Sequence, residues 1–184
     1  MLSMDLRGPR LHIRRPRLDD APASYRWFAN PDVTAYLPLA GKSKLPLEDI
    51  KAYLARVATT DRPDLAVTID LLDRGPIGCG GFRNFDADAA ELSLVLGEPS
   101  VWGQGLGTEA MQLLLAFAFD QLALKRVWLL VRADNQRAVK LFGRMGFVVI
   151  ERQRGVVVVD DSPRDKLRME LTARPSAPAE PISN

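Results

Sequence analysis

The sequence predicts an α/β fold: one domain with a mixed, mostly antiparallel β-sheet flanked by helices. Segments of alternating apolar and polar residues, typical of strands, lie between segments whose apolar residues recur every three to four positions, typical of helices. A short turn, Asp73-Arg74-Gly75, joins two strand-like runs in the manner of an antiparallel hairpin. The 184 residues, 47% of them hydrophobic, are enough for one domain with a sizeable core.

The N-terminal half is expected to begin with a loose leader over residues 1–9, followed by a strand over residues 11–18. Asp19-Asp20 supplies an N-cap for a helix that runs through Phe28. Asn30-Pro31 ends that helix, because proline cannot continue it. Pro46 is a favoured first residue of a helix. The remaining elements of this half are that second helix, with its apolar face at Leu47, Ile50, Leu54 and Val57, and two strands over residues 65–72 and 76–82.

The C-terminal half is expected to contain four strands, two helices and a tail. In the strand over residues 90–96, alternation places Glu91, Ser93 and Val95 on one face. The other elements are a helix over residues 107–122, a strand over 126–131, a helix over 135–145, and a closing hairpin from 147 to 159 and 166 to 171. Residues 173–184 carry three prolines and almost no large apolar residues, which predicts a disordered tail. The domain therefore spans residues 10–172.

Composition excludes several classes of function. The net charge of +2 is too small, and too evenly spread, for a nucleic-acid surface. No apolar run approaches the roughly 18 residues of a membrane span, and residues 1–9 lack the apolar core of a signal peptide, so we expect a cytoplasmic protein. The single cysteine, Cys79, allows no internal disulfide and is interpreted as a small buried filler. No metal site is predicted.

The most informative motif is a glycine loop, Gly103, Gly105 and Gly107, between a strand and a helix. Glycines let the backbone approach a ligand closely, and the start of a helix offers unpaired N–H groups and a partial positive charge. The loop lacks the Lys-Ser or Lys-Thr of a Walker motif, since Thr108 follows Gly107. It also comes too late in the chain for a dinucleotide-binding fold. Two readings remain: a tight turn of purely geometric role, or an anion site.

The surroundings of this loop resemble the GNAT family of N-acetyltransferases, and within it the RimJ/RimL-like branch. The loop Trp102-Gly103-Gln104-Gly105-Leu106-Gly107 matches the family's pyrophosphate loop, with Trp102 where most members have Arg or Gln. A second block follows at the family's distance, formed by Asn135, Ala138, Leu141, Phe142, Gly146 and Phe147. The resemblance covers about residues 10–172 and implies a single GNAT domain whose central strands splay apart.

The resemblance also implies the residues that bind acetyl-CoA, the expected acyl donor. The main chain of Leu94, Val95 and Leu96 would bond the pantetheine arm as an added strand does. Asn135 would reach the same arm, although Asn is also a favoured N-cap and both roles can hold together. The pyrophosphate would lie on Trp102, Gly103, Gln104, Gly105, Leu106 and Gly107, together with Thr108.

Catalytic groups are harder to place, because this chain departs from the family pattern. Many members carry a Tyr as general acid where this chain has Phe142, and some N-terminal acetyltransferases carry a Glu where it has Leu130. Neither role transfers. We expect Glu91 and Ser93 to handle the amine, because both share the strand face beside the expected thioester; the alternative is a solvated Glu91 and a space-filling Ser93. Tyr36 is expected to line the acceptor pocket, or else to be a core aromatic.

The function expected from these features is acetyl transfer from acetyl-CoA to a primary amine by direct attack. The acceptor would be a protein N-terminus or a small-molecule amine; an aminoglycoside or polyamine acetyltransferase is an alternative. The missing Tyr and Glu leave open a second class, a non-catalytic acyl-CoA binding or sensing module. A homodimer is possible, since relatives are often dimers, and no nucleic-acid or membrane partner is expected.

Overall fold

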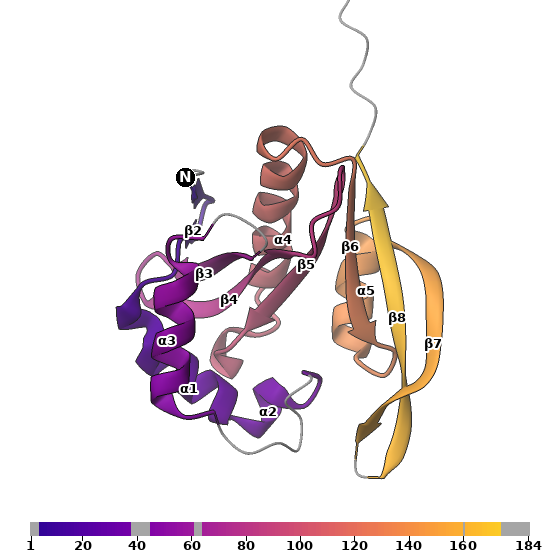
Figure 1. The fold of residues 1–184 in the computed structure, drawn as a ribbon, viewed down its shortest axis with the longest axis horizontal. Coiled ribbons are helices and arrows are strands. Elements are labelled where there is room, and N and C mark those ends of the chain that lie inside the picture. The colour runs from indigo at the N-terminus through magenta and orange to yellow at the C-terminus, as the bar shows by residue number, and fades with distance from the viewer. Residues whose placement is uncertain (1–3, 38–44, 61–63, 160, 174–184) are drawn as a thin grey trace, which may run out of the picture.

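The computed structural model describes residues 4–37, 45–60, 64–159 and 161–173 (Figure 1). Within these residues, eight strands form one sheet in the order β1-β2-β3-β4-β5-β6-β8-β7. Every neighbouring pair is antiparallel except β5 and β6, which run parallel. The strands are β1 (Asp5–Arg7), β2 (Leu11–Arg14), β3 (Leu65–Leu71), β4 (Gly75–Arg83), β5 (Ala89–Leu96), β6 (Arg126–Arg132), β7 (Val148–Val159) and β8 (Ser162–Thr172). The predicted mixed, mostly antiparallel sheet is confirmed.

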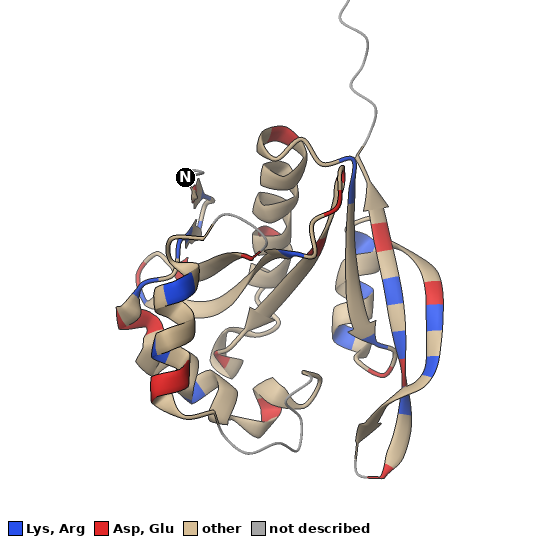
Figure 2. Cartoon of the chain, in the orientation of Figure 1, with Lys and Arg blue, Asp and Glu red and all other residues tan. Residues whose placement is uncertain are grey.

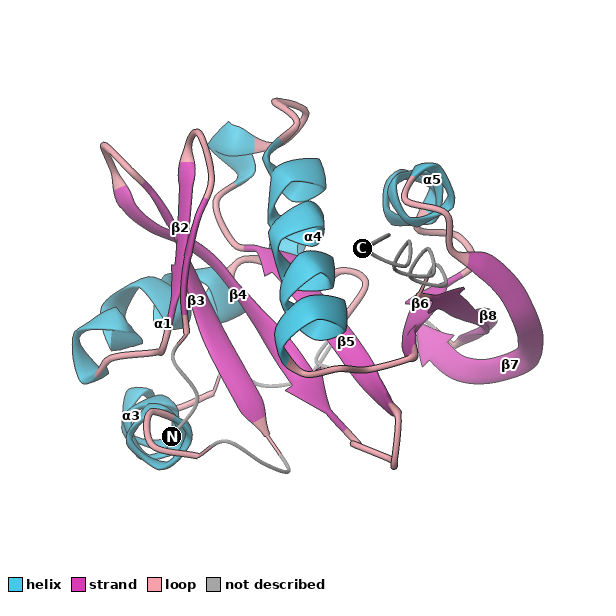
Figure 3. Cartoon of the chain, turned by 90° about the horizontal axis from the view of Figure 1, so that it is seen from above, coloured by secondary structure: helices cyan, strands magenta, loops and turns pink. Residues whose placement is uncertain are grey.

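Helices cover both faces of this sheet. Figure 3 shows α4 and α5 on one face, and α1 and α3 on the other face beneath the N-terminal strands. The helices are α1 (Ala21–Ala29), α2 (Pro31–Thr34), α3 (Leu47–Val57), α4 (Leu106–Ala116), which continues as a π-helical turn over Phe117–Gln121, and α5 (Gln136–Arg144). None of the described helices is long and apolar enough to cross a membrane.

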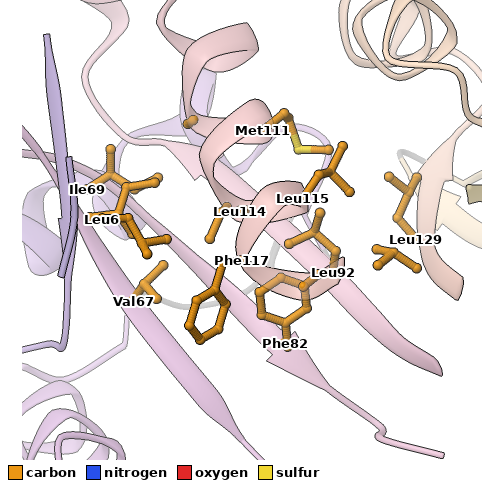
Figure 4. Packing of buried hydrophobic residues seen from close by; sticks show 14 of the residues in the cluster. Leu6, Val67, Ile69, Phe82, Leu92, Met111, Leu114, Leu115, Phe117 and Leu129 are labelled. Carbon is orange, nitrogen blue, oxygen red and sulfur yellow. The ribbon is translucent and has the colours of Figure 1, made fainter. Parts of the chain in front are cut away.

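The main core lies between α4 and the sheet. Figure 4 shows Leu114 and Phe117 of the helical segment beside Val67, Phe82 and Leu92 of the strands. The rings of Phe82 and Phe117 are 6.3 Å apart. The alternation predicted for these strands therefore sends one apolar face to α4. The same cluster extends under α5, where Phe142 packs against Phe147 with ring centroids 6.0 Å apart.

The central strands pair for only three residues and then separate. Ala89, Ala90 and Glu91 of β5 pair with Arg126, Val127 and Trp128 of β6. Beyond Glu91 the two strands have no further register partners, although β5 continues to Leu96 and β6 to Arg132. The sheet is thus open between its two halves, as the resemblance implied.

Three expectations need correction. Residues 5–7 are not part of a loose leader but form β1, which pairs with β2 and buries Leu6 in the core. The strand predicted over residues 11–18 ends at Arg14. Asp20 precedes α1 as expected, but its side chain makes no cap bond to that helix and instead points inward to Arg14. The disordered tail was expected over residues 173–184, and all of these except Ala173 lie outside the described residues.

Candidate active site

The glycine loop sits at the N-terminus of α4 in a conformation that only glycine adopts readily. Gly103 and Gly105 have φ angles of +78° and +80°. A Cβ on Gly103 would meet no atom within 4 Å, and one on Gly105 would meet only Arg10. The loop is therefore open to a ligand on this side. The N–H groups of residues 103–107 donate to no acceptor in the described part of the chain, which leaves them available for an anion.

A groove of about 590 Å³ runs from this loop to the gap between β5 and β6. Gly103, Gly105 and Gly107 line it at the α4 end, together with Thr108. Arg137 and Arg144 of α5 add positive charge to its wall. An open glycine loop, free N–H groups and two cations fit the pyrophosphate and phosphate groups of coenzyme A.

The exposed backbone edge of β5 lies in this groove. The N–H of Gly97 donates to the carbonyl of Ile77 on β4. Successive residues of an antiparallel strand direct their backbone N–H and C=O groups to opposite edges of the strand. The backbone groups of Val95 therefore point to β4, whereas those of Leu94 and Leu96 point to the gap. The carbonyl of Leu96 already accepts the Trp102 indole N–H at 2.9 Å. Leu94 therefore offers the free N–H and C=O of the three residues predicted to bind pantetheine, and Val95 is also among the residues that line the groove.

Asn135 and Trp102 both have structural roles beside the groove. The side-chain oxygen of Asn135 accepts the N–H of Ala138 at 3.2 Å and caps α5. Its amide group donates to no described residue, so the cap leaves it free toward the groove that it lines. The Arg137 guanidinium lies 4.0 Å from the centre of the Trp102 ring. Trp102 thus holds β5 through Leu96 and α5 through Arg137, on either side of the groove.

An ion pair that the sequence did not reveal supports the loop from behind. Glu109 accepts the N–H groups of Arg10 and Leu11 at 2.8 and 3.1 Å and pairs with the Arg10 guanidinium at 2.8 Å. The same guanidinium donates to the carbonyl of Gln104 at 2.9 Å. Burial alone would raise the pKa of Glu109, but these hydrogen bonds outweigh it and hold the pKa below its ordinary value. Arg10 and Glu109 are 99 residues apart, which is why no local pattern indicated them.

Arg10→Ala is expected to raise the KM for acetyl-CoA about tenfold and to leave kcat close to wild type. The variant removes the bond that fixes Gln104, and a charge-assisted bond contributes about 1.5–3 kcal/mol. Glu109 keeps its two backbone donors, so the fold should persist. Steady-state thiol release measures both constants. Arg7→Ala, an exposed arginine on β1, is the control, and an unchanged KM in Arg10→Ala would contradict this role.

Glu91 and Ser93 lie on the same face of β5, as predicted, but neither lines the main groove. The Glu91 carboxylate is buried and accepts bonds from Arg83 and Asn84, each at 2.6 Å. Ser93 lines a smaller pocket of about 170 Å³ with Tyr53 of α3, and its hydroxyl lies 3.5 Å from the carbonyl of Gly81. The side chains of Val95, Ser93 and Glu91 project to the face of the sheet on which α1 and α3 lie, opposite α4 and α5.

Tyr36, just after α2, lines the main groove together with Asp32, and its role in an acceptor pocket stays a prediction. The Arg132 guanidinium at the end of β6 lies 4.9 Å from its ring centre. Arg132 also donates to the carbonyl of Ala35 at 2.6 Å and to both oxygens of Asp134 at 2.6 and 3.0 Å. These bonds lower the pKa of Asp134. Arg132 thereby ties the segment after α2 to the C-terminal half of the sheet across the gap.

The positions that depart from the family pattern carry no proton-transfer group. Phe142 is buried, packs against Phe147 and lines the groove. Leu130 on β6 is exposed. The Cys79 thiol packs against Trp27, and burial raises its pKa to about 12. It therefore stays protonated near neutral pH, in keeping with its interpretation as a filler.

The fold and the site together are those of a transferase that uses an acyl-coenzyme A. Residues 10–148 match the family model of the GNAT acetyltransferase domain. The chain therefore belongs to the GNAT family and is an acetyl-CoA-dependent N-acetyltransferase.

Relatives of known sequence and structure agree with this assignment. The chain is 26% identical over 147 residues to the uncharacterized N-acetyltransferase p20 of Bacillus licheniformis, an alignment that covers 75% of this chain and 79% of the relative. It is 32% identical over 60 residues to the spermidine N(1)-acetyltransferase of Escherichia coli, covering 33% and 32%.

Solved structures share the fold. A GNAT-family acetyltransferase from Bacillus anthracis superposes with a TM-score of 0.80 at 18% identity, covering 92% of this chain and 98% of the other. The spermidine N-acetyltransferase of Vibrio cholerae in complex with CoA and spermine gives a TM-score of 0.80 at 17% identity, covering 90% and 96%.

Proposed function

We propose that this enzyme acetylates the α-amino group of a polypeptide, as a member of the RimJ/RimL-like branch. The observation that carries the proposal is the gap between β5 and β6, with the unpaired backbone of Leu94 at its edge. On the side of α4 and α5 the gap meets the glycine loop and can receive the donor. The side of α1, α2 and α3 is left for the amine.

For the donor, we propose that Leu94 and Asn135 hold the pantetheine arm and that residues 102–107, with Thr108, hold the pyrophosphate. The N–H of Leu94 then lies where it can polarise the thioester carbonyl. A neutral amine attacks this carbonyl, a C–N bond forms, and the C–S bond breaks with release of the coenzyme A thiolate. The proton lost by the amine balances the one that the thiolate gains.

The lack of a family acid at Phe142 and of a family base at Leu130 favours an α-amino acceptor. A lysine-like amine has a pKa of about 10.4, whereas an α-amino group has a pKa of about 8. At pH 7 about a tenth of the α-amino groups are neutral, whereas fewer than about one lysine amine in a thousand is neutral. A site with little proton-transfer chemistry can therefore use the first kind of acceptor far better.

We assign the remaining proton transfer to Glu91, working with Ser93 on the same strand face. Glu91→Gln is expected to lower kcat by about 100-fold or more, because general base catalysis contributes about 10²–10⁴-fold. The KM for acetyl-CoA should stay unchanged. Asp86→Asn, an exposed carboxyl near the same turn, is the control. A kcat within twofold of wild type would remove Glu91 from the mechanism.

The alternative acceptor is a polycation, since relatives include spermidine acetyltransferases. Among the described residues that line the main groove, Asp32 is the one carboxylate, and Asp64 in the smaller pocket is paired with Arg56 at 3.1 Å. A spermidine or aminoglycoside site needs several free carboxylates to match its charges.

A panel of amines tests the acceptor. Thiol release with acetyl-CoA is measured for N-terminal peptides, spermidine and an aminoglycoside, and products are confirmed by mass spectrometry. We expect peptides to give the highest kcat/KM. A higher value for spermidine would replace the proposed acceptor. Tight CoA binding with no turnover on any amine would instead indicate an acyl-CoA binding module.

A further inference from the structure

One face of the C-terminal half of the sheet has no described helix over it. Figure 3 shows α5 on one side of β6 and β8, and none of the described helices on the other. The register pairs Leu130 of β6 with Arg168 of β8, and Trp128 with Glu91 of β5. Register partners project to the same face of a sheet. Trp128, Leu130 and Arg168 therefore share the face that carries Glu91 and Ser93, on which the amine is proposed to bind.

Arg168 on this face has no hydrogen-bond or ion-pair partner in the described part of the chain. Its guanidinium carbon lies 4.5 Å from the centre of the Trp128 ring, and its Nε is shielded from solvent without a hydrogen-bond partner. A shielded donor without a partner is costly, and stacking on an aromatic ring holds the guanidinium in place without satisfying its N–H groups.

The carboxylates nearest to Arg168 in register do not pair with it. Glu151 is its direct partner on β7 but accepts from Gln153 at 3.3 Å. Glu170 lies 4.0 Å from Arg126. Other arginines in the sheet do have carboxylate partners, namely Arg14, Arg83, Arg132 and Arg152. Arg168 is thus a fixed cation whose N–H groups are left for an anion (Figure 2 shows the basic residues along β8).

We propose that Arg168 binds a carboxylate of the acceptor, so that the preferred substrate is an amine followed closely by an acidic group. This inference rests on the proposed polypeptide acceptor. Paired strands in a sheet are about 4.8 Å apart, which would place Arg168 on β8 about 10 Å from Ser93 on β5. Because β5 and β6 separate beyond Glu91, the distance across the sheet is at least this large. An extended peptide advances about 3.3 Å per residue. A Glu or Asp at position 2 or 3 of the acceptor can therefore reach Arg168 while the α-amino group lies beside the gap.

The test uses C-terminally amidated tetrapeptides that carry Glu or Gln at position 2, 3 or 4, so that the side chain is the one variable carboxylate. For the wild type we expect kcat/KM to be about 10- to 100-fold higher with Glu than with Gln at position 2 or 3. Arg168→Gln should remove this preference by raising the KM for the Glu peptides. The values for Gln peptides and the KM for acetyl-CoA should not move.

Two further variants separate recognition from folding. Arg168→Lys keeps the charge and should retain a reduced preference for Glu. Arg154→Gln removes an exposed charge from β7 and should behave as wild type. Equal use of Glu and Gln peptides by the wild type, or an equal loss for both in Arg168→Gln, overturns the role of Arg168 and leaves the peptide acceptor standing. Turnover of spermidine with none of any peptide overturns the proposed acceptor itself, and this inference with it.

Discussion

Gly107→Glu is expected to weaken coenzyme A binding by about 100-fold or more and to shift the melting temperature by no more than a few degrees. Gly107 is in the first turn of α4, and a Cβ there would lie 3.4 Å from Leu141 and 3.7 Å from Leu96, both of which line the groove. These are ordinary contacts, so the fold accepts the side chain. Its carboxylate, however, enters the groove where the free N–H groups await an anion, and a loss of about 2.7 kcal/mol corresponds to 100-fold.

Gly143→Glu provides the matched control for this variant. Gly143 is also helical, on the exposed side of α5, and a Cβ there meets nothing within 4 Å. Titration calorimetry with coenzyme A and a thermal melt measure the affinity and the melting temperature of both variants. If Gly107→Glu bound coenzyme A as the wild type does, the glycines would serve turn geometry alone.

The features that the sequence predicted well are those that depend on residues close together in the chain. The strand alternation, the helix periodicity and the glycine loop each depend on residues within a dozen positions of one another. The order of the elements followed from these patterns, and the splayed central strands from the family resemblance carried by Trp102–Gly107 and Asn135. The short strand β1 was missed because Asp5–Arg7 is too short to show a period. The cap role of Asp20 was wrong because a buried arginine competes for its carboxylate.

The residues that the sequence could not indicate are those that act across long separations. Arg10 supports the loop through Glu109 and Gln104, and Arg132 reaches Ala35 across the gap. Arg168 faces the proposed acceptor side only because of the register of β6 and β8. Charged residues at such spacings look like an ordinary solvated surface in the sequence. Their roles depend on which strands become neighbours, and a single sequence does not record this.

Asp20→Ala is expected to lower the free energy of unfolding by about 3 kcal/mol, because it leaves a buried arginine short of a partner. Asp20 and Arg14 are 3% and 7% exposed. The two side chains form a bidentate pair at 2.8 and 2.9 Å, and Asp20 also accepts the Thr68 hydroxyl and the Arg17 N–H, each at 2.8 Å. Asp70 still pairs with Arg14 at 2.7 Å, which keeps the expected cost at the lower end of the range for broken buried pairs. The cluster joins β2, β3 and the start of α1.

The effect of Asp20 should depend on pH in a defined direction. Burial would raise the pKa of Asp20, but the bonds from Arg14, Arg17 and Thr68 outweigh it and leave the pKa below its ordinary value. A carboxyl group with a lowered folded pKa stabilises the protein fully above its unfolded pKa, about 3.9, and loses this effect as the pH falls through the folded value. Urea unfolding at pH 7 should therefore separate the wild type from Asp20→Ala, and the difference should narrow below about pH 4. Asp19→Ala, a change at the exposed neighbour, should match the wild type at every pH. A similar loss of unfolding free energy in Asp19→Ala would show that the buried pair does not stabilise this fold. A difference between the wild type and Asp20→Ala that grows toward acid pH would show the same.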